Sequence, residues 1–118
     1  MATRATYSFS RPHGPQVTVY KHWDGYPEGA ADHLTDALTA EAFIRKHPDS
    51  EITAERDAHS DTEWHYSIHH VTACIDGQTV KQVLIWVMCR APWEADDWVT
   101  VYDGPIDAWF QQQKREAA

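Results

Sequence analysis

The chain has 118 residues, 42% of them hydrophobic, and a formal net charge of −8. This length predicts a single domain over residues 1–118. The acidic balance argues against direct binding to nucleic acid, whose affinity comes mainly from Lys and Arg on phosphates. The sequence has neither the apolar segment of a signal peptide nor an apolar run of about 18 residues, so we expect no membrane contact and a cytoplasmic location.

The first part of the chain predicts a hairpin followed by a helix. Residues 3–9 and 16–23 are rich in β-branched and aromatic types, and the turn signal "RPHGP" separates them. From residue 30 onward apolar side chains recur at helical spacing, and Pro48 prevents continuation. We therefore expect one longer helix over about residues 28–46.

The rest of the chain adds strands and a second helix. A short strand begins at residue 51, a polar loop follows, and "WVTVY" at 98–102 predicts another strand. A short helix is expected over about residues 105–115, with Pro105 at its first position. The expected fold class is α+β: an antiparallel sheet of five or six strands with both helices on one face.

Asp76 and Gly77 stand between two long strand-like runs and predict a two-residue hairpin turn. Counting back from that turn pairs Ile75 with Gln78 and Trp64 with Cys89, and opposed residues share a face. One face of the hairpin is β-branched and aromatic and suits the helices. The other face combines polar and large apolar residues, namely Glu63, His65, Ser67, His69, Leu84, Trp86 and Met88.

This second face has two interpretations. Either other parts of the chain cover it, or it is an exposed apolar patch of the kind that marks contact surfaces. Under the second interpretation we expect partner contact at the hairpin and steering by acidic loops. The candidate contact residues are His65, His69, Leu84, Trp86 and Met88, and the candidate steering residues are Asp57, Asp61, Glu94, Asp96 and Asp97.

The cysteine and histidine patterns predict neither a disulfide nor a metal site. The predicted register separates Cys74 from Cys89 by roughly 30 Å along the strands, so both are expected to be free thiols. No Cys-x-x-Cys pair or helical His-Glu-x-x-His motif occurs. His65 and His69 are about 13 Å apart along a strand, too far for one metal, and His70 points to the opposite face. His59, Asp61 and His65 could approach one another only if the loop folds back, and we expect no metal site and no cofactor.

The corner at residues 21–29 has a structural and a functional interpretation. Gly25 and Gly29 permit a positive φ, Pro27 suits a helix start, and acidic residues can cap the helix. The same stretch also concentrates polar side chains that could form a small active site or ligand site. No nucleophile or phosphate-loop motif supports an enzyme, so no catalytic residue is assigned; the ligand candidates are Lys21, His22, Asp24, Tyr26 and Glu28.

Two motifs carry a resemblance to known proteins. Thr3 and Arg4 follow the initial Met, and residues 23–29 read Trp-Asp-Gly-Tyr-Pro-Glu-Gly. Both resemble the N-terminal hairpin and corner of small uncharacterised proteins of bacteriophages and prophages. The resemblance covers about 30 residues and implies a mobile-element origin, a setting in which small acidic proteins often inhibit host machinery, as anti-CRISPR proteins do.

Three functional hypotheses follow from the sequence. The leading one is a phage-derived acidic protein that inhibits a host defence or nucleic-acid-processing complex by binding a protein with a basic surface. The second is a small enzyme or ligand-binding domain that uses the corner at residues 21–28. The third is a homodimer that buries the Trp86 face.

Overall fold

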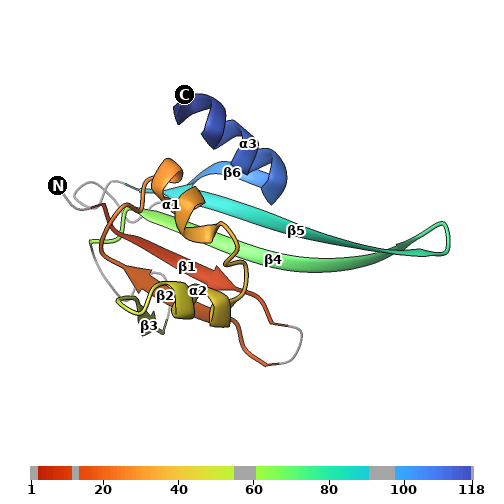
Figure 1. Cartoon of the computed structure of the whole chain (residues 1–118), viewed down its shortest axis with the longest axis horizontal. Coiled ribbons are helices and arrows are strands. Elements are labelled where there is room, and N and C mark those ends of the chain that lie inside the picture. Colours follow the sequence, from red (N-terminus) through yellow and green to blue (C-terminus); the bar gives the residue numbers. More distant parts are fainter. Residues whose placement is uncertain (1–2, 12–13, 55–60, 91–97, 118) are drawn as a thin grey trace.

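The computed structural model describes residues 3–11, 14–54, 61–90 and 98–117 (Figure 1). Within this part of the chain, six strands form one sheet in the order β3-β2-β1-β4-β5-β6. The strands are β1 (Ala5–Phe9), β2 (Val17–Lys21), β3 (Glu51–Thr53), β4 (Trp64–Ile75), β5 (Gln78–Cys89) and β6 (Val99–Pro105). The helices are α1 (Pro27–Leu34), α2 (Ala40–Lys46) and α3 (Ile106–Ala117).

The α+β class and the six-stranded sheet agree with the prediction, but the sheet is not wholly antiparallel. β1 pairs with β4 in parallel, and the other neighbouring strands are antiparallel. β3 adds to the outer side of β2 and, because it is antiparallel to β2, runs in the same direction as β1 and β4. The chain must then pass to the other side of β1 before β4 can join the sheet. The sequence pattern of an individual strand does not predict this crossover from β3 to β4.

The central hairpin has the predicted register. Ile75 pairs with Gln78 and Trp64 pairs with Cys89, without a bulge between. Asp76 has φ 52° and Gly77 has φ 78°, the conformation that a tight two-residue hairpin turn requires. Cys74 and Cys89 are both free, as predicted.

The prediction of one longer helix over 28–46 is wrong, because the chain breaks between α1 and α2. Asp36 adopts a positive φ of 59°, which a continuous helix does not allow. Thr39 is the N-cap of α2, and its Oγ1 accepts a hydrogen bond from Ala42 N at 3.1 Å. The Lys46 ammonium donates to the carbonyl oxygens of Asp32 and Thr35 at 2.8 Å, so α2 satisfies the end of α1.

The C-terminal helix is present, one residue later than predicted at its start. Pro105 is the last residue of β6 and α3 begins at Ile106. An apolar stripe of α3 faces inward: Ile106 and Trp109 are buried, and Phe110 packs against the core. Among the described residues, no helix combines the length and the apolar character needed to cross a membrane.

The core lies between the helices and the aromatic face of the sheet. Tyr7 stacks on Tyr66 at 5.2 Å between ring centroids and lies 4.6 Å from Phe43 of α2. The Tyr66 hydroxyl donates to the carbonyl oxygen of Gly25 at 2.6 Å, which satisfies its buried polar end. The core cluster also contains Leu34 of α1 and residues of α3, so all three helices contribute to it.

Candidate functional site

The second face of the sheet carries a buried polar layer where β1, β2, β4 and β5 lie side by side. His65 is 4% exposed and sits in the middle of this layer. Its Nδ1 lies 2.7 Å from Thr6 Oγ1, and its Nε2 lies 3.0 Å from Ser67 Oγ. Ser8 Oγ and Thr18 Oγ1 form a further hydrogen bond at 2.7 Å. Both nitrogens of His65 are therefore occupied within the protein.

The end of this face near Met88 is covered by the chain itself. Met88 is 3% exposed, and the Trp98 ring lies 6.0 Å from the His65 ring in an edge contact. The Arg90 guanidinium sits 4.6 Å from the centroid of Trp98. Of the five candidate contact residues, His65 and Met88 therefore belong to the interior in this conformation.

The remaining candidates lie farther along the same face and reach the surface. Trp86 is 39% exposed, while His69 and Leu84 are half-buried. The Trp86 indole N–H donates to Thr100 Oγ1 at 2.9 Å. This bond orients the indole and satisfies its only donor, so the exposed ring is available for apolar contact.

Beyond Trp86 the hairpin extends out of the body of the protein as a two-stranded arm, which we define as residues 71–82 (Figure 1). β1 pairs with β4 only up to Ile68, and β6 pairs with β5 only from Leu84 onward. Every residue of the arm is exposed. An isolated two-stranded hairpin, with no third strand or helix packed on it, is only marginally stable in water. Contact with another strand, helix or protein would therefore stabilise this arm.

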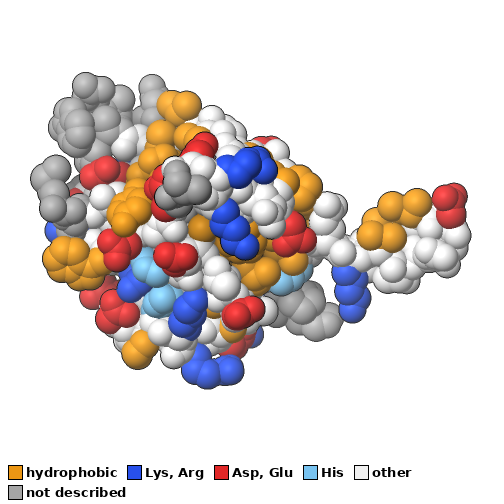
Figure 2. Space-filling model, turned by 45° about the horizontal axis from the view of Figure 1, so that its top comes forward, with side chains coloured by type: hydrophobic (Ala, Val, Ile, Leu, Met, Phe, Trp, Pro, Cys, Tyr) orange, Lys and Arg blue, Asp and Glu red, His pale blue; other side chains and the backbone are white. Residues whose placement is uncertain are grey.

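One side of the arm continues the apolar character of the Trp86 region. Val71 is 40% exposed, Val80 43% and Ile75 54%, and the strand register places all three on the Trp86 side. Figure 2 shows hydrophobic side chains along the projecting arm. We call this surface the arm stripe; it consists of Val71, Ala73, Ile75, Val80, Leu84 and Trp86.

Charge is distributed unequally between the arm and the rest of the chain. The arm contains one acid, Asp76, and one base, Lys81, so its net charge is zero, and the remainder of the chain carries the whole −8. Lys81 pairs with Thr72 on the side opposite the arm stripe. The arm stripe itself contains no charged residue and is therefore suited to apolar contact.

The acidic steering candidates are only partly described. Asp61 accepts a hydrogen bond from the Tyr20 hydroxyl at 3.0 Å and forms an ion pair with Arg4 at 2.9 Å. Burial and the bond to Asp61 raise the pKa of Tyr20 to about 12. Asp61 is thus engaged with Tyr20 of β2 and with Arg4. The other four candidates, Asp57, Glu94, Asp96 and Asp97, lie outside the described residues, as does His59.

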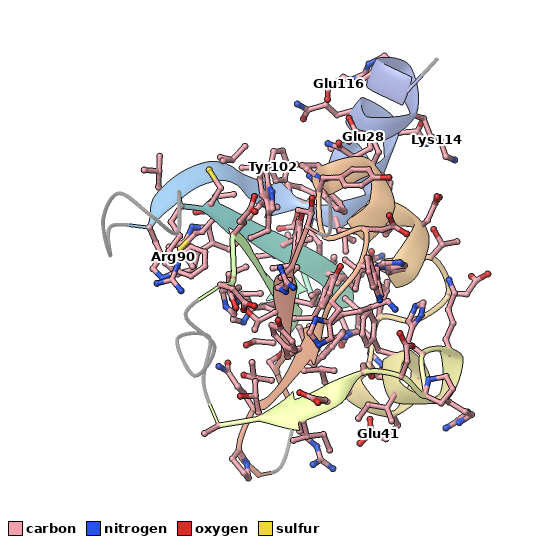
Figure 3. All side chains as sticks on the ribbon, turned by 90° about the vertical axis from the view of Figure 1, so that its left-hand side faces the viewer. Glu28, Glu41, Arg90, Tyr102, Lys114 and Glu116 are labelled. Atoms are coloured by element: carbon pink, nitrogen blue, oxygen red, sulfur yellow. The ribbon has the colours of Figure 1, made fainter. Side chains whose placement is uncertain are left out.

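The candidate ligand residues of the corner do not converge on one site. Lys21 is 6% exposed and pairs with Asp49 at 2.9 Å on the helix side of the sheet. His22 lies in edge contact with Tyr20, whose side chain belongs to the opposite face. Asp24 and Tyr26 are exposed, and Glu28 lies on α1 (Figure 3). Lys21 and His22 point to opposite faces because successive side chains alternate along a strand. The strand pattern of the sequence already predicts this separation.

The two glycines of the corner serve a different purpose from the predicted one. Neither has a positive φ; that conformation belongs to Asp24, with φ 57°. A Cβ on Gly25 would lie 2.7 Å from the Cβ of Ala5, and a Cβ on Gly29 would lie 2.3 Å from the Asp24 carbonyl oxygen. Tyr26 is the N-cap of α1 and makes no side-chain capping bond. Close backbone approach, rather than acidic capping, therefore defines this corner.

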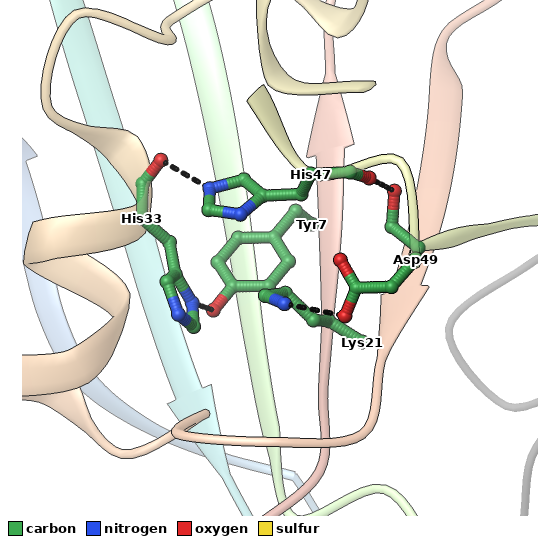
Figure 4. A network of polar contacts seen from close by, with 6 residues as sticks. Tyr7, Lys21, His33, His47 and Asp49 are labelled. Atoms are coloured by element: carbon green, nitrogen blue, oxygen red, sulfur yellow. Dashed lines mark hydrogen bonds and ion pairs between the residues drawn. The ribbon is translucent and has the colours of Figure 1, made fainter. Parts of the chain in front are cut away.

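A partly buried titratable cluster, which the sequence analysis did not identify, connects the corner to both N-terminal helices (Figure 4). The Tyr7 hydroxyl lies 3.3 Å from His33 Nδ1, and the His47 ring lies 4.8 Å from the His33 ring. His47 Nε2 lies 3.1 Å from the carbonyl oxygen of His33 and must donate, because a carbonyl can only accept. The nearby Lys21–Asp49 pair completes the cluster.

The electrostatics of this cluster keep its histidines neutral. Burial, and then the positive charge of Lys21, lower the pKa of His33 to about 4. The pKa of His47 is also lowered, mainly by burial. The hydrogen bond from Lys21 lowers the pKa of Asp49. Neutral imidazoles packed on Tyr7 and Phe43 act here as polar core residues that join α1, α2 and β1.

Groups that could hold a metal are absent from the described part of the chain: no three His, Cys, Asp or Glu side chains converge there. Comparisons with family models, with curated proteins and with solved structures find no match to this chain.

Proposed function

We propose that this chain is a protein-binding module whose contact surface is the arm stripe. The observation that carries the proposal is the exposure of Val71, Ile75, Val80 and Trp86 along one side of the hairpin. An apolar row on a two-stranded ribbon has no partner within the described chain, and burial by another protein would remove it from water.

The charge distribution supports a partner with a basic surface around an apolar groove. The body of the protein carries the net charge of −8, which would accelerate encounter with such a partner. The neutral arm would then make the contact without burying a charge. Within this proposal the partner is a host defence or nucleic-acid-processing complex, the class that the resemblance to small phage proteins implies.

The test is capture of a partner from bacterial host lysate by two matched variants. Val80→Glu places a charge in the arm stripe, and Thr79→Glu places the same charge on the opposite side of the same strand. We expect wild type and Thr79→Glu to capture the same protein and Val80→Glu to lose it. Capture should also weaken as the salt concentration is raised, because salt screens the attraction between the acidic protein and a basic partner. Equal capture by the two variants contradicts the proposal.

A homodimer formed through the same stripe is a second candidate, and the zero net charge of the arm favours it. Two copies of a chain with net charge −8 repel each other least where neither carries net charge. Light scattering at high concentration separates the candidates. A dimer that Val80→Glu dissociates and Thr79→Glu does not would establish self-association, whereas a wild-type monomer rules it out.

A further inference from the structure

The projecting arm has two outer strand edges, and no other strand of the described chain covers either of them. β1 pairs with β4 only as far as Ile68, and β6 pairs with β5 only from Leu84 onward. Figure 1 shows the two strands of the arm continuing together past the ends of β1 and β6. Each outer edge therefore presents backbone groups that a further strand can pair with.

The hairpin turn determines which backbone groups point outward. The tight turn at 76–77 makes Ile75 and Gln78 a pair that exchanges both of its backbone hydrogen bonds. Along an antiparallel ladder, such pairs alternate with pairs whose N–H and C=O groups point away from the partner strand. Within the β4 half of the arm, the outward groups therefore belong to Thr72 and Cys74.

Hydrogen bonds at the base of the arm support this alternation. The backbone N–H of His70 donates to Ser10 Oγ at 3.2 Å, and the Ile68 carbonyl oxygen accepts from Ser10 N at 3.0 Å. Ser10 follows β1 on the outer side of β4, so the groups of residues 68 and 70 point outward. Thr72 and Cys74 continue the same alternation beyond the end of β1.

The outer edge of β4 lacks the features that usually keep strand edges from pairing. Residues 71–75 include neither a charged residue nor a proline, and all five are exposed. The outer edge of β5 is different, because Lys81 lies on it. A lysine on an edge strand opposes pairing, and two copies joined there would bring their ammonium groups together. β4 is therefore the edge that is open to another strand.

We propose that two copies of this chain pair through the outer edges of β4, so that their arms form one four-stranded sheet. Antiparallel pairing of a strand with its own copy is a two-fold arrangement, in which the same residues contribute from both sides. With the axis near residues 73–74, Thr72 and Cys74 of each copy exchange hydrogen bonds with the other copy. Four strands also remove the marginal stability of an isolated two-stranded hairpin.

The charge distribution explains why a second copy fits this edge. The arm has no net charge, whereas the rest of each copy carries −8. Antiparallel pairing places the two acidic bodies at opposite ends of the four-stranded sheet. The paired segment, residues 70–76, is roughly 20 Å long. That length exceeds the Debye length of about 8 Å at physiological ionic strength, so salt largely screens the repulsion between the bodies.

This pairing uses the edge of the arm and leaves the arm stripe free. Outward-pointing residues must face their equivalents across the axis, so Val71, Ala73 and Ile75 of both copies lie on one face. The dimer thus joins two arm stripes into one larger apolar surface. Edge pairing does not require that this surface bind a host protein, and it differs from a dimer that buries the stripe itself.

The first test is light scattering of the purified full-length protein with two matched proline variants. Cys74 and Thr79 lie directly opposite each other, and both N–H groups point outward. Proline is tolerated at such positions, so Cys74→Pro and Thr79→Pro both retain the pairing of β4 with β5. At high concentration we expect wild type and Thr79→Pro to have twice the monomer mass, and Cys74→Pro to have the monomer mass.

The second test is cross-linking with a short bismaleimide. Wild type should give a covalent dimer, because the two copies of Cys74 lie near the axis. In the double variant Cys74→Ser/Thr79→Cys the thiol moves to the outer side of β5. Three strand spacings, roughly 14 Å, then separate the two thiols across the sheet, and the yield should fall several-fold. Cys89 is present in both proteins and provides the common background.

Three results would overturn edge pairing: a monomeric wild type, equal effects of the two proline variants, or equal cross-linking yields. A dimer that Val80→Glu dissociates and Cys74→Pro does not would assign self-association to the arm stripe, and it would also overturn the proposal. Capture of a host protein is measured separately in lysate. A failure of that capture would therefore contradict the proposed function without changing these results.

Discussion

Gly29 and Asp24 approach each other so closely that no larger residue fits at position 29. A Cβ built on Gly29 would lie 2.3 Å from the carbonyl oxygen of Asp24. This contact lets the chain turn from β2 into α1 within a few residues. It also explains a glycine inside a helix, where glycine is otherwise unfavourable by about 1 kcal/mol relative to alanine.

Gly29→Ala is therefore expected to destabilise the protein although alanine is the better helix former. We expect a loss of about 2–3 kcal/mol, because the clash is with backbone and cannot be relieved by a rotamer change. Urea denaturation measures it. Asp32→Ala, at an exposed position of α1, is the control and should be neutral or slightly stabilising. Unchanged stability of Gly29→Ala would refute the close approach.

Acid is expected to weaken the fold through His33. The pKa of His33 is lowered to about 4, whereas an unfolded histidine titrates near 6.5. Between these values the unfolded chain binds a proton that the folded chain does not, so stability falls as the pH falls from about 6.5 to 4. Because His33 is only partly buried, we discount the full shift to a loss of about 1–2 kcal/mol.

The control for this pH dependence is His33→Asn, which keeps a polar group near Tyr7 and cannot titrate. Its free energy of unfolding should depend less steeply on pH over the same window than that of wild type. His47 acts in the same direction and remains in the variant, so part of the slope should persist. Identical pH profiles for the two proteins would show that His33 does not carry the effect.

The Lys21–Asp49 pair should show a measurable coupling energy. The Lys21 side chain is 7% exposed and its Asp49 partner 58%. Asp49→Ala leaves a buried ammonium without its partner and should cost about 1–2 kcal/mol. In a Lys21→Met background the same change should cost little, because the buried charge is already gone. Denaturant titration of wild type, the two single variants and the double variant gives the coupling energy by a double-mutant cycle. An equal cost of Asp49→Ala in both backgrounds would exclude the coupling.

The two thiols should react at different rates in the native protein. Cys74 is exposed on the arm, whereas Cys89 is half-buried and burial raises the pKa of its thiol. Because the thiolate is the reactive form, a colorimetric thiol reagent should modify Cys74 quickly and Cys89 slowly. Cys74→Ser should abolish the fast phase. A fast phase that survives this substitution would place the reactive thiol at Cys89.

The arm should be dispensable for folding. Removing residues 71–74 and 79–82 deletes four residue pairs, retains the Asp76-Gly77 turn and keeps each remaining side chain on its own face. All eight deleted residues are exposed, so the free energy of unfolding should change by less than about 1 kcal/mol. Thermal denaturation tests this. A large loss of stability would mean that the arm supports the core and is not a contact device.

Local chemistry was sufficient to predict much of this fold. The Asp76-Gly77 turn and the period of two along the strands determine the register from Trp64 to Cys89, because both act between near neighbours. The α+β class, the free cysteines and the short C-terminal helix follow from similar short-range patterns. The register alone also places Val71, Ile75, Val80 and Trp86 on one side of the hairpin.

Tertiary structure alone decided which of those residues reach solvent. His65 and Met88 carry the same alternation as Trp86, yet neighbouring strands and Trp98 cover them. The arm is exposed because β1 and β6 end where they do, and strand length is not encoded in the hairpin itself. Likewise Asp36 breaks the expected helix, and α1 and α3 pack together although they are far apart in the sequence. Such outcomes depend on long-range packing, which no local pattern reports.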